Sequence, residues 1–156
     1  MRWILYKNNL GDRLKILGLD VGDRKIGVAL SDPLLITAQG IKTIFKESNK
    51  QAIDEIIDLI NDHHVEKVVV GLPLNMNNTL GPQGDKTKAF MNKVVKKIKY
   101  TTRIDWSVEL IYFDERLSSK SAEDLLIRGD VSRKNRKKVI DKLAAVIILQ
   151  NYLDSL

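Results

Sequence analysis

Three acidic positions in this sequence end or interrupt apolar runs, where a carboxylate is costly to keep. Asp20 lies in "LGLDVGDRKIGVALSD", the pair Asp114 and Glu115 ends "ELIYFDE", and Asp141 lies in "VIDKLAAVIILQNYL". A carboxylate removed from water needs compensation, and a bound cation supplies it. Because carboxylate oxygens are hard ligands, such a set favours Mg²⁺ or Mn²⁺ over zinc. The three positions therefore predict a divalent-metal site.

Asp20 and Asp141 also have structural explanations. An Asp at a strand end near a glycine often forms a turn or caps N–H groups, and an Asp in the first turns of a helix can interact with the helix dipole. The dipole explanation is the weaker one, because helical spacing puts Asp141 on the face that packs against the sheet. That face holds Asp141, Ala145, Ile148 and Tyr152. The small side chains of Ala144 and Ala145 would let this helix approach the strands closely.

The neighbouring carboxylates Asp114 and Glu115 are expected to have different roles. Adjacent residues of a strand point to opposite faces, so only one of the two can reach the site if the strand geometry continues through both. Glu115 lies beyond the last apolar residue and has the longer side chain, so we expect it to be the ligand. Asp114 is better placed to anchor the turn into the next helix, through Ser118 or Ser119.

The apolar periodicity predicts the elements that would position these carboxylates. Strands are expected over 14–22, 25–32, 36–45, 65–72 and 107–114, and helices over 51–60, 85–99, 120–128 and 138–154. The first two strands are separated by a tight polar turn and predict a hairpin. The order β-β-β-α-β-α-β-α-α predicts an α/β fold, the ribonuclease H-like mixed five-stranded sheet with helices on both faces. We expect residues 1–13 to be an N-terminal extension and 14–156 to be a single domain.

Composition restricts the chemistry and the surroundings of the protein. The chain has 156 residues, of which 44% are hydrophobic and 29% charged, and it has no cysteine. A disulfide framework and a thiolate metal site are therefore excluded. No apolar run reaches the length needed to cross a membrane, and we expect a cytoplasmic protein. His63 and His64 are far along the chain from the carboxylates and are expected to end a helix.

The net charge of +6 is unevenly distributed. Residues 47–66 are acidic, whereas 86–103 and 133–142 are rich in Lys and Arg, which suits a polyanion such as nucleic acid. Solvated helix faces would explain the same pattern. The candidate nucleic-acid contacts are Arg133, Lys134, Lys137 and Lys138 in a predicted basic loop, and Asn75 in the Asn-, Gly- and Pro-rich loop after residue 72. That second loop could instead be only a flexible connection.

Four motifs in this order resemble one family. They are "LGLDVGDRKIGVALSD", "VVVGLPLNMNNTLGPQ", "YFDERLSS" and "DKLAAVIILQNYL". Together they cover residues 14–154 and are similar to the YqgF family, also called RuvX, of Holliday junction resolvase-like proteins and precursor 16S rRNA nucleases. The resemblance implies a ribonuclease H-like fold, divalent-metal-dependent nuclease activity and trimming of the 5′ end of precursor 16S rRNA. It places the acidic site at Asp20, Glu115 with Asp114, and Asp141. The mechanism that we expect for such a site is two-metal phosphodiester hydrolysis, in which Asp20 would bridge the ions.

Some features remain open within that resemblance. True resolvases of this fold carry a glutamate where "VVVGLP" has Gly71, so the "DER" carboxylate must take over its role. Arg116 could hold a phosphate oxygen or pair with Asp114 or Glu115. The alternatives are a Holliday junction resolvase acting on branched DNA, a non-catalytic nucleic-acid-binding module, and one lobe of an actin-like or sugar-kinase-like ATP-binding protein. The oligomeric state is not predicted.

Overall fold

A five-stranded mixed sheet forms the centre of the molecule. The computed structural model describes residues 15–114 and 133–156, and of residues 133–142 it describes only the backbone. The elements are β1 (Lys15–Val21), β2 (Lys25–Ser31), β3 (Ala38–Phe45), α2 (Asn49–His63), β4 (Val65–Leu72), α3 (Pro82–Tyr100), β5 (Glu109–Asp114) and α5 (Arg133–Asp154). The strand order is β3-β2-β1-β4-β5. The pairs β1–β2 and β2–β3 are antiparallel, whereas β1–β4 and β4–β5 are parallel, so the predicted mixed sheet is confirmed.

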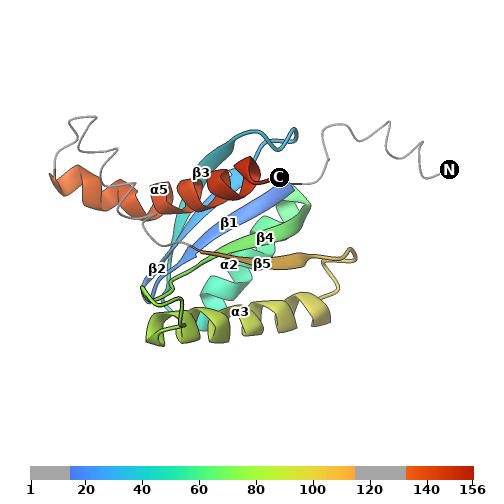
Figure 1. The fold of residues 1–156 in the computed structure, drawn as a ribbon. Coiled ribbons are helices and arrows are strands. Elements are labelled where there is room, and N and C mark those ends of the chain that lie inside the picture. The colour runs from blue at the N-terminus through green and yellow to red at the C-terminus, as the bar shows by residue number, and fades with distance from the viewer. Residues whose placement is uncertain (1–14, 115–132) are drawn as a thin grey trace.

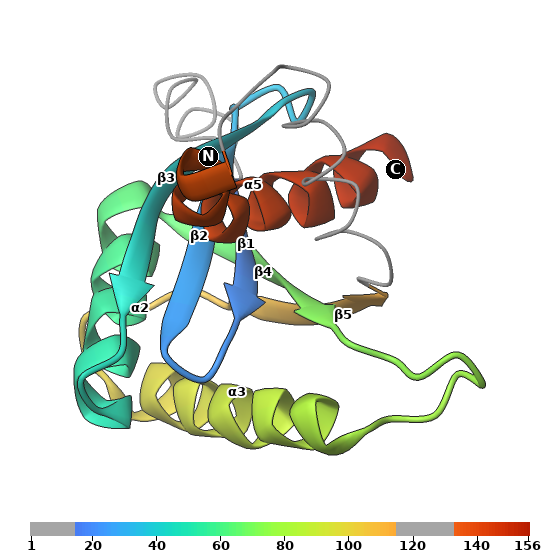
Figure 2. The same ribbon diagram turned by 90° about the vertical axis from the view of Figure 1, so that its left-hand side faces the viewer.

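Helices cover both faces of this sheet (Figures 1 and 2). On one face α2 and α3 pack over a large apolar cluster that includes Leu17, Leu19 and Val70. On the other face α5 packs over a smaller cluster that includes Ile16 and Val69. Successive residues of β1 and β4 thus alternate between the two clusters, as the pleat of a strand requires. The predicted layer arrangement is confirmed.

The turn between β1 and β2 depends on Gly22. Its N–H donates a hydrogen bond of 2.8 Å to the carbonyl of Lys25, and a Cβ at Gly22 would lie 2.8 Å from that same oxygen. A side chain therefore has no room on the inside of the turn. The predicted hairpin is confirmed, and its tight turn explains the glycine two residues after Asp20.

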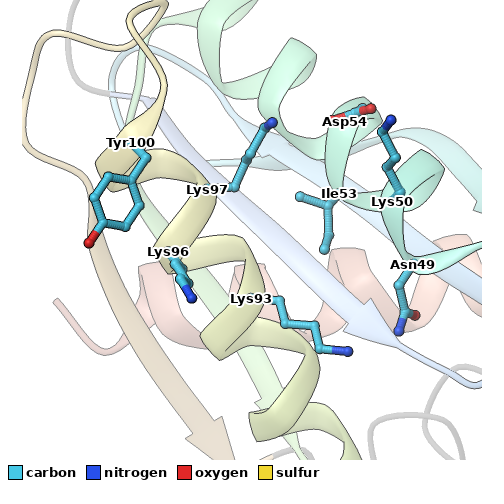
Figure 3. A pocket seen from close by; sticks show the side chains of 8 residues that line it. All are labelled: Asn49, Lys50, Ile53, Asp54, Lys93, Lys96, Lys97 and Tyr100. Carbon is cyan, nitrogen blue, oxygen red and sulfur yellow. The ribbon is translucent and has the colours of Figure 1, made fainter.

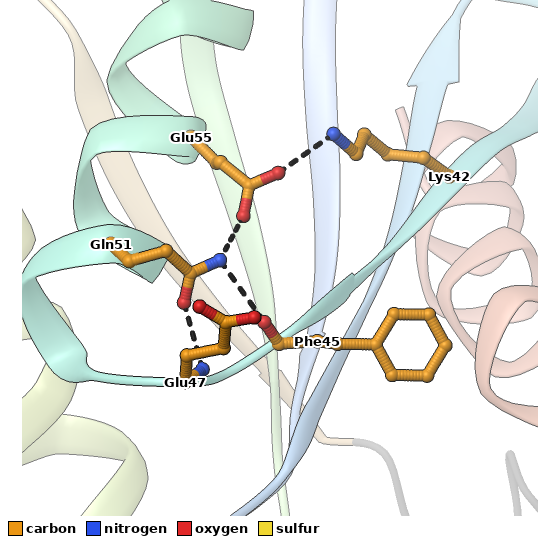
Figure 4. Close-up of polar contacts among 5 residues, drawn as sticks. All are labelled: Lys42, Phe45, Glu47, Gln51 and Glu55. Atoms are coloured by element: carbon orange, nitrogen blue, oxygen red, sulfur yellow. Dashed lines mark hydrogen bonds and ion pairs between the residues drawn. The ribbon is translucent and has the colours of Figure 1, made fainter.

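The start of α2 is fixed by a side-chain network around Gln51 (Figure 4). Ser48 is the N-cap, and its hydroxyl accepts a 3.0 Å hydrogen bond from the N–H of Gln51. The Gln51 amide accepts from the N–H of Glu47 at 2.9 Å and donates to the carbonyl of Phe45 at 3.0 Å and to Glu55. This capping box satisfies N–H groups that a helix start leaves without partners, so α2 can begin at Asn49, after only three connecting residues.

The turn between β2 and β3 explains why β3 begins two residues later than predicted. The Asp32 carboxylate accepts hydrogen bonds from the N–H groups of Ile36 (2.7 Å) and Thr37 (2.8 Å), so these residues belong to the turn. Gln150 of α5 then holds the start of β3, because its amide donates to the Ile36 carbonyl and accepts from the Ala38 N–H, both at 2.9 Å. The end of α5 is thereby tied to the sheet.

The last helix begins earlier than predicted. We expected it to begin near residue 138, but α5 begins at Arg133. The physical reason is that Lys and Arg are good helix formers, so the charged run continues the helix instead of forming a loop. The predicted helix over 120–128 and the extension over 1–13 lie outside the described residues. No helix in the described ranges is long and apolar enough to span a membrane.

Candidate functional site

Asp20 lies near the carboxyl end of β1 and is half-buried. The strand alternates, so Asp20 shares a face with Ile16 and Gly18, whereas Leu17 and Leu19 belong to the cluster on the other face. Asp20 is thus on the side of the sheet that α5 covers. A carboxylate at the edge of an apolar layer, with partial access to water, is suited to bind a cation that arrives from solvent.

Gly18 allows α5 to approach β1 unusually closely. A Cβ at Gly18 would lie 2.7 Å from the Cβ of Leu149 and 3.3 Å from the carbonyl oxygen of Ala145. The first distance is shorter than any ordinary carbon–carbon contact, so only glycine fits without moving the helix. Ala144 and Ala145 are both buried, as expected for the small residues of a close contact. The glycine two residues before Asp20 therefore positions the helix that carries Asp141.

The backbone places Asp141 near the same end of this contact as Asp20. Asp141 is one helical turn before Ala145, about 6 Å along the axis, and Asp20 is about 7 Å beyond Gly18 along β1. Figure 1 shows α5 lying along β1 in the opposite direction, so both displacements lead toward the carboxyl end of β1. The predicted sheet-facing side of α5 is confirmed at Ala145, Ile148 and Tyr152, which are all buried. The side chain of Asp141 is outside the described residues.

The early start of α5 also weakens the dipole explanation for Asp141. Because α5 begins at Arg133, Asp141 is the ninth residue of the helix rather than part of its first turn. The effect of a helix dipole on a charge falls off within one turn of the terminus. A carboxylate at this depth in the helix needs another reason to be there, and proximity to the end of β1 provides one.

The end of β5 places Asp114 on the face opposite to Asp20. In the register, Val68 pairs with Leu110 on one face and Val69 with Ile111 on the other. Continuing the alternation, Asp114 falls on the face of Leu110, which α2 and α3 cover. The next residue of an extended chain would fall on the α5 face. That residue is Glu115, which, like Arg116, lies outside the described residues, and the assignment of Glu115 as ligand stays a prediction.

Gly71 lies between these carboxylate positions. Leu19 of β1 pairs with Val70 of β4, so the next residues of the two parallel strands, Asp20 and Gly71, lie side by side. On its other side, Gly71 pairs with Phe113 of β5. Gly71 is buried and belongs to the α5 face. It therefore places no side chain, and so no carboxylate, between β1 and the end of β5.

The loop after β4 is held by its own polar side chains. Leu74 and Leu80 form an isolated bridge, and the Asn75 N–H donates to the Thr79 carbonyl at 2.8 Å. The Asn75 amide donates to the Thr79 hydroxyl at 3.1 Å, and that hydroxyl donates to Asn77 at 2.6 Å. This loop forms a closed turn, and a contact of Asn75 with nucleic acid stays a prediction. Asn75 is exposed at the same end of the sheet as Asp20.

The predicted basic loop is part of a helix, which corrects our expectation for its residues. Arg133, Lys134, Lys137 and Lys138 lie in the first two turns of α5, and their side chains are outside the described residues. Residues 133, 134, 137 and 138 have the i, i+3 and i+4 spacings of one helix face. A single helical face could therefore present all four charges to a phosphate backbone.

Two further sets of residues bear on the choice of site. Where side chains are described, no three His, Asp or Glu residues lie close enough to hold a metal ion, but two of the three predicted ligands are not among them.

His64 caps the end of α2 and stacks on Trp106, with ring centres 3.9 Å apart, which confirms its expected place at the helix end. Sequence reasoning missed Tyr100 and Lys46 as surface features. The i, i+3 and i+4 spacing of Lys93, Lys96, Lys97 and Tyr100 would have placed Tyr100 on a basic face of the helix.

Comparison with known proteins places this arrangement in a family. Residues 14–155 match the family model "RuvX: Holliday junction resolvase". A Clostridium tetani protein named "Putative pre-16S rRNA nuclease" is 51% identical over 142 residues, covering 91% of this chain and 97% of its own. A Listeria innocua protein of the same name is 50% identical over 144 residues, covering 91% and 99%.

Solved structures show the same fold at low sequence identity. Thermus thermophilus RuvC, in complex with a Holliday junction substrate, has a TM-score of 0.56 and 14% identity, with 92% of this chain and 95% of that chain covered. The Fowlpox virus resolvase, in complex with Holliday junction DNA, has a TM-score of 0.56 and 15% identity, covering 91% and 98%. These likenesses support the ribonuclease H-like sheet predicted from the element order. With a family model that spans nearly the whole chain and relatives at about half identity, this chain belongs to the RuvX family.

Proposed function

We propose that this chain is a metal-dependent nuclease that hydrolyses phosphodiester bonds in structured nucleic acid and processes the 5′ end of precursor 16S rRNA. The close contact of α5 with β1 at Gly18 is the observation that carries this proposal. On one face of the sheet, it brings the backbone of Asp141 and the carboxylate of Asp20 toward the carboxyl end of β1. The names of relatives at about 50% identity support the choice of RNA substrate.

The proposed donor set fits a divalent cation. Asp20, Glu115 and Asp141 would supply only carboxylate oxygens, which suit Mg²⁺ or Mn²⁺. When bound, such ions activate water and stabilise the leaving oxygen of a phosphodiester. Without them three carboxylates would repel a phosphate, so the same set serves poorly for simple nucleic-acid binding.

The surrounding residues would bind and orient the substrate. Asp20 is carried by a central strand with partners on both sides, so its position is rigid, as a catalytic group requires. Arg116 follows the Glu115 position and would hold a non-bridging phosphate oxygen. Asn75, in its closed turn, would contact the nucleic acid at the same end of the strands as Asp20. The four basic residues at the start of α5 would contact phosphates further along.

The test is cleavage by matched variants. Asp20→Asn should abolish cleavage of a precursor 16S rRNA 5′ fragment in Mg²⁺ or Mn²⁺, because the amide removes the charge that holds the ion. Asp62→Asn makes the same chemical change at an exposed position of α2 and should cleave like the wild type. Metal-free Asp20→Asn should melt at the same temperature as the wild type or higher, since one of several mutually repelling charges is gone.

Three outcomes would overturn parts of this proposal. Equal cleavage by Asp20→Asn and wild type would remove Asp20 from the site. A clear fall in the melting temperature of Asp20→Asn would favour its turn-capping role. A four-way DNA junction cut in preference to the RNA fragment would retain the nuclease and replace its substrate.

A further inference from the structure

A second charged region lies between α2 and α3, on the face of the sheet opposite to α5. A cavity of about 410 Å³ opens there between the two helices, and Figure 3 shows lysines from both helices arranged around Ile53. Ile53 is buried and forms an apolar floor. The four lysines of this groove are Lys50, Lys93, Lys96 and Lys97. We call this cavity the α2–α3 groove.

The positive charge of the α2–α3 groove is largely uncompensated. Asp54 is the one acidic side chain among its lining residues. Within the part of the chain that the structure describes, none of the four groove lysines takes part in an ion pair. Like charges at this spacing repel each other, and an anion in the groove would relieve that repulsion.

Lys46 extends the same charge toward the hairpin turn. Burial lowers the pKa of Lys46; Asp23 opposes this shift and Lys93 adds to it. The Lys46 ammonium lies 4.4 Å from the centre of the Phe90 ring. The backbone N–H of Lys46 donates a hydrogen bond of 2.8 Å to the Arg24 carbonyl. Lys46 thus connects the groove with the turn that directly follows the Asp20 strand, and Figure 2 shows that turn above α3.

Tyr100 adds an aromatic surface at the end of the groove. It is 71% exposed, and the Lys99 ammonium lies 6.0 Å from its ring centre. Surfaces that bind single-stranded nucleic acid combine a basic groove for the backbone with exposed aromatic rings on which bases stack. The α2–α3 groove has both components.

We propose that the α2–α3 groove binds a segment of single-stranded RNA that leads away from the cleavage site around the β1–β2 turn. This inference rests on the proposed nuclease function and adds to it a second contact region on the opposite face of the sheet. Phosphates contact the lysines of α2 and α3, and one base stacks on Tyr100. The substrate therefore has an unpaired strand of several nucleotides next to the bond that is cut.

The test is fluorescence anisotropy with a labelled 16-nucleotide oligouridylate in EDTA, where no metal-dependent cleavage occurs. The double variant Lys96→Gln/Lys97→Gln should weaken binding and reduce the slope of log affinity against log salt by about 1.4, or about 0.7 per lost phosphate contact. The matched control Lys15→Gln/Lys67→Gln removes the same charge near the opposite end of the sheet, at the starts of β1 and β4. It should leave the slope nearly unchanged.

Tyr100 provides a separate measurement. Tyr100→Ala should weaken oligouridylate binding about tenfold through the lost stacking, without changing the salt slope, and Tyr100→Phe should retain the affinity. All these positions except Lys15 and Lys67 are exposed on a helix surface, and melting curves verify that each variant folds.

The outcomes separate this inference from the proposed function. Equal weakening by the groove and control variants would mean that total charge, not the groove, binds RNA. Complete displacement of the oligouridylate by uridine monophosphate at the same nucleotide concentration would indicate a small-molecule site instead. A chain that binds RNA through the groove but cleaves no nucleic acid would overturn the proposed nuclease and leave the groove in place.

Discussion

The two faces of the sheet are covered in different ways. On one face α2 buries bulky isoleucines against the strands, among them Ile56 and Ile60. On the other face α5 meets β1 where Gly18 has no side chain, and presents Ala145 and Leu149 to it. Large side chains maximise the apolar area removed from water, whereas small ones bring two backbones close together. The α2–α3 face therefore buries the larger apolar side chains, and the α5 face brings the backbones of α5 and β1 close together.

The largest expected effect on cleavage comes from the two acidic residues at the end of β5, which are assigned to opposite faces of the sheet. Glu115→Gln should lower the cleavage rate more than about 100-fold, because changing even the outer partners of metal ligands costs 10- to 100-fold. Asp114→Asn, at the position that the alternation assigns to the α2–α3 face, should keep measurable activity and melt at a lower temperature. Cleavage rates and melting curves of both variants provide the comparison.

Exchanged phenotypes would show that Asp114 is the ligand. The strand alternation would then have to break between Phe113 and Asp114, turning the last residue of β5 toward α5. A metal-bound structure with Asp114 oxygens about 2.1 Å from Mg²⁺ would lead to the same conclusion.

An intermediate effect is expected at the close contact itself. Gly18→Ala should lower the free energy of unfolding by about 1–3 kcal/mol, the usual cost of overpacking, because its Cβ meets Leu149. It should also reduce cleavage at 25 °C, since α5 must move away from β1 and carries Asp141 with it. Thermal melting and the cleavage rate of the folded variant measure the two effects separately.

The matched control lies on the other face. Ile56→Val should cost about 0.5–1.5 kcal/mol of stability, and its cleavage at 25 °C should equal that of the wild type. If Gly18→Ala and Ile56→Val lost stability to a similar degree and both retained full activity, the close contact would not determine the geometry of the site.

The smallest expected effect concerns the turn that ties the end of α5 to the sheet. Hydrogen bonds from the backbone N–H groups of Thr37, and then of Ile36, lower the pKa of Asp32, against an opposing effect of burial. Because the folded pKa is below the unfolded value of about 3.9, this stabilisation is present above pH 4 and is lost as the pH falls through the folded pKa. Asp32→Asn should therefore melt slightly below the wild type at pH 7.

The difference between Asp32→Asn and wild type should shrink as the pH is lowered below 4, because the wild-type carboxyl then becomes neutral too. Melting curves at pH 7, 4 and 3 measure this change. A difference that stays constant over this range would mean that hydrogen-bond geometry, rather than charge, stabilises the turn.

Much of the fold could be predicted because local patterns agree with the tertiary structure. The spacing of Ile53, Ile56 and Ile60 predicts the helix that forms, and the run "VEKVVVGL" predicts β4 with the bounds that are observed. The start of α5 could not be predicted, because a run of Lys and Arg is compatible with either a solvated loop or a helix. The helix propensity of Lys and Arg is a weak preference, and it extends α5 because the residues that follow already form a helix packed on the sheet.

The candidate site was predictable only in part, for a related reason. Helical periodicity predicts the sheet-facing side of α5, which is confirmed at Ala145, Ile148 and Tyr152, whereas the place of Asp141 on that side stays a prediction. In contrast, the sequence shows a glycine at position 18 but does not indicate which helix packs against it. The α2–α3 groove depends on two helices that lie 19 residues apart in sequence, between His63 and Pro82, and only their packing brings Lys50 next to the lysines of α3.

The place of α5 in the chain has a consequence for synthesis on the ribosome. All five strands are made before α5, and domains generally fold in the order in which they emerge. Until residues 133–154 have left the exit tunnel, Ile16, Ala29 and Val69 have no helix to cover them. The proposed nuclease site therefore cannot assemble before α5 has emerged, and a nascent chain that has made only the five strands would lack it.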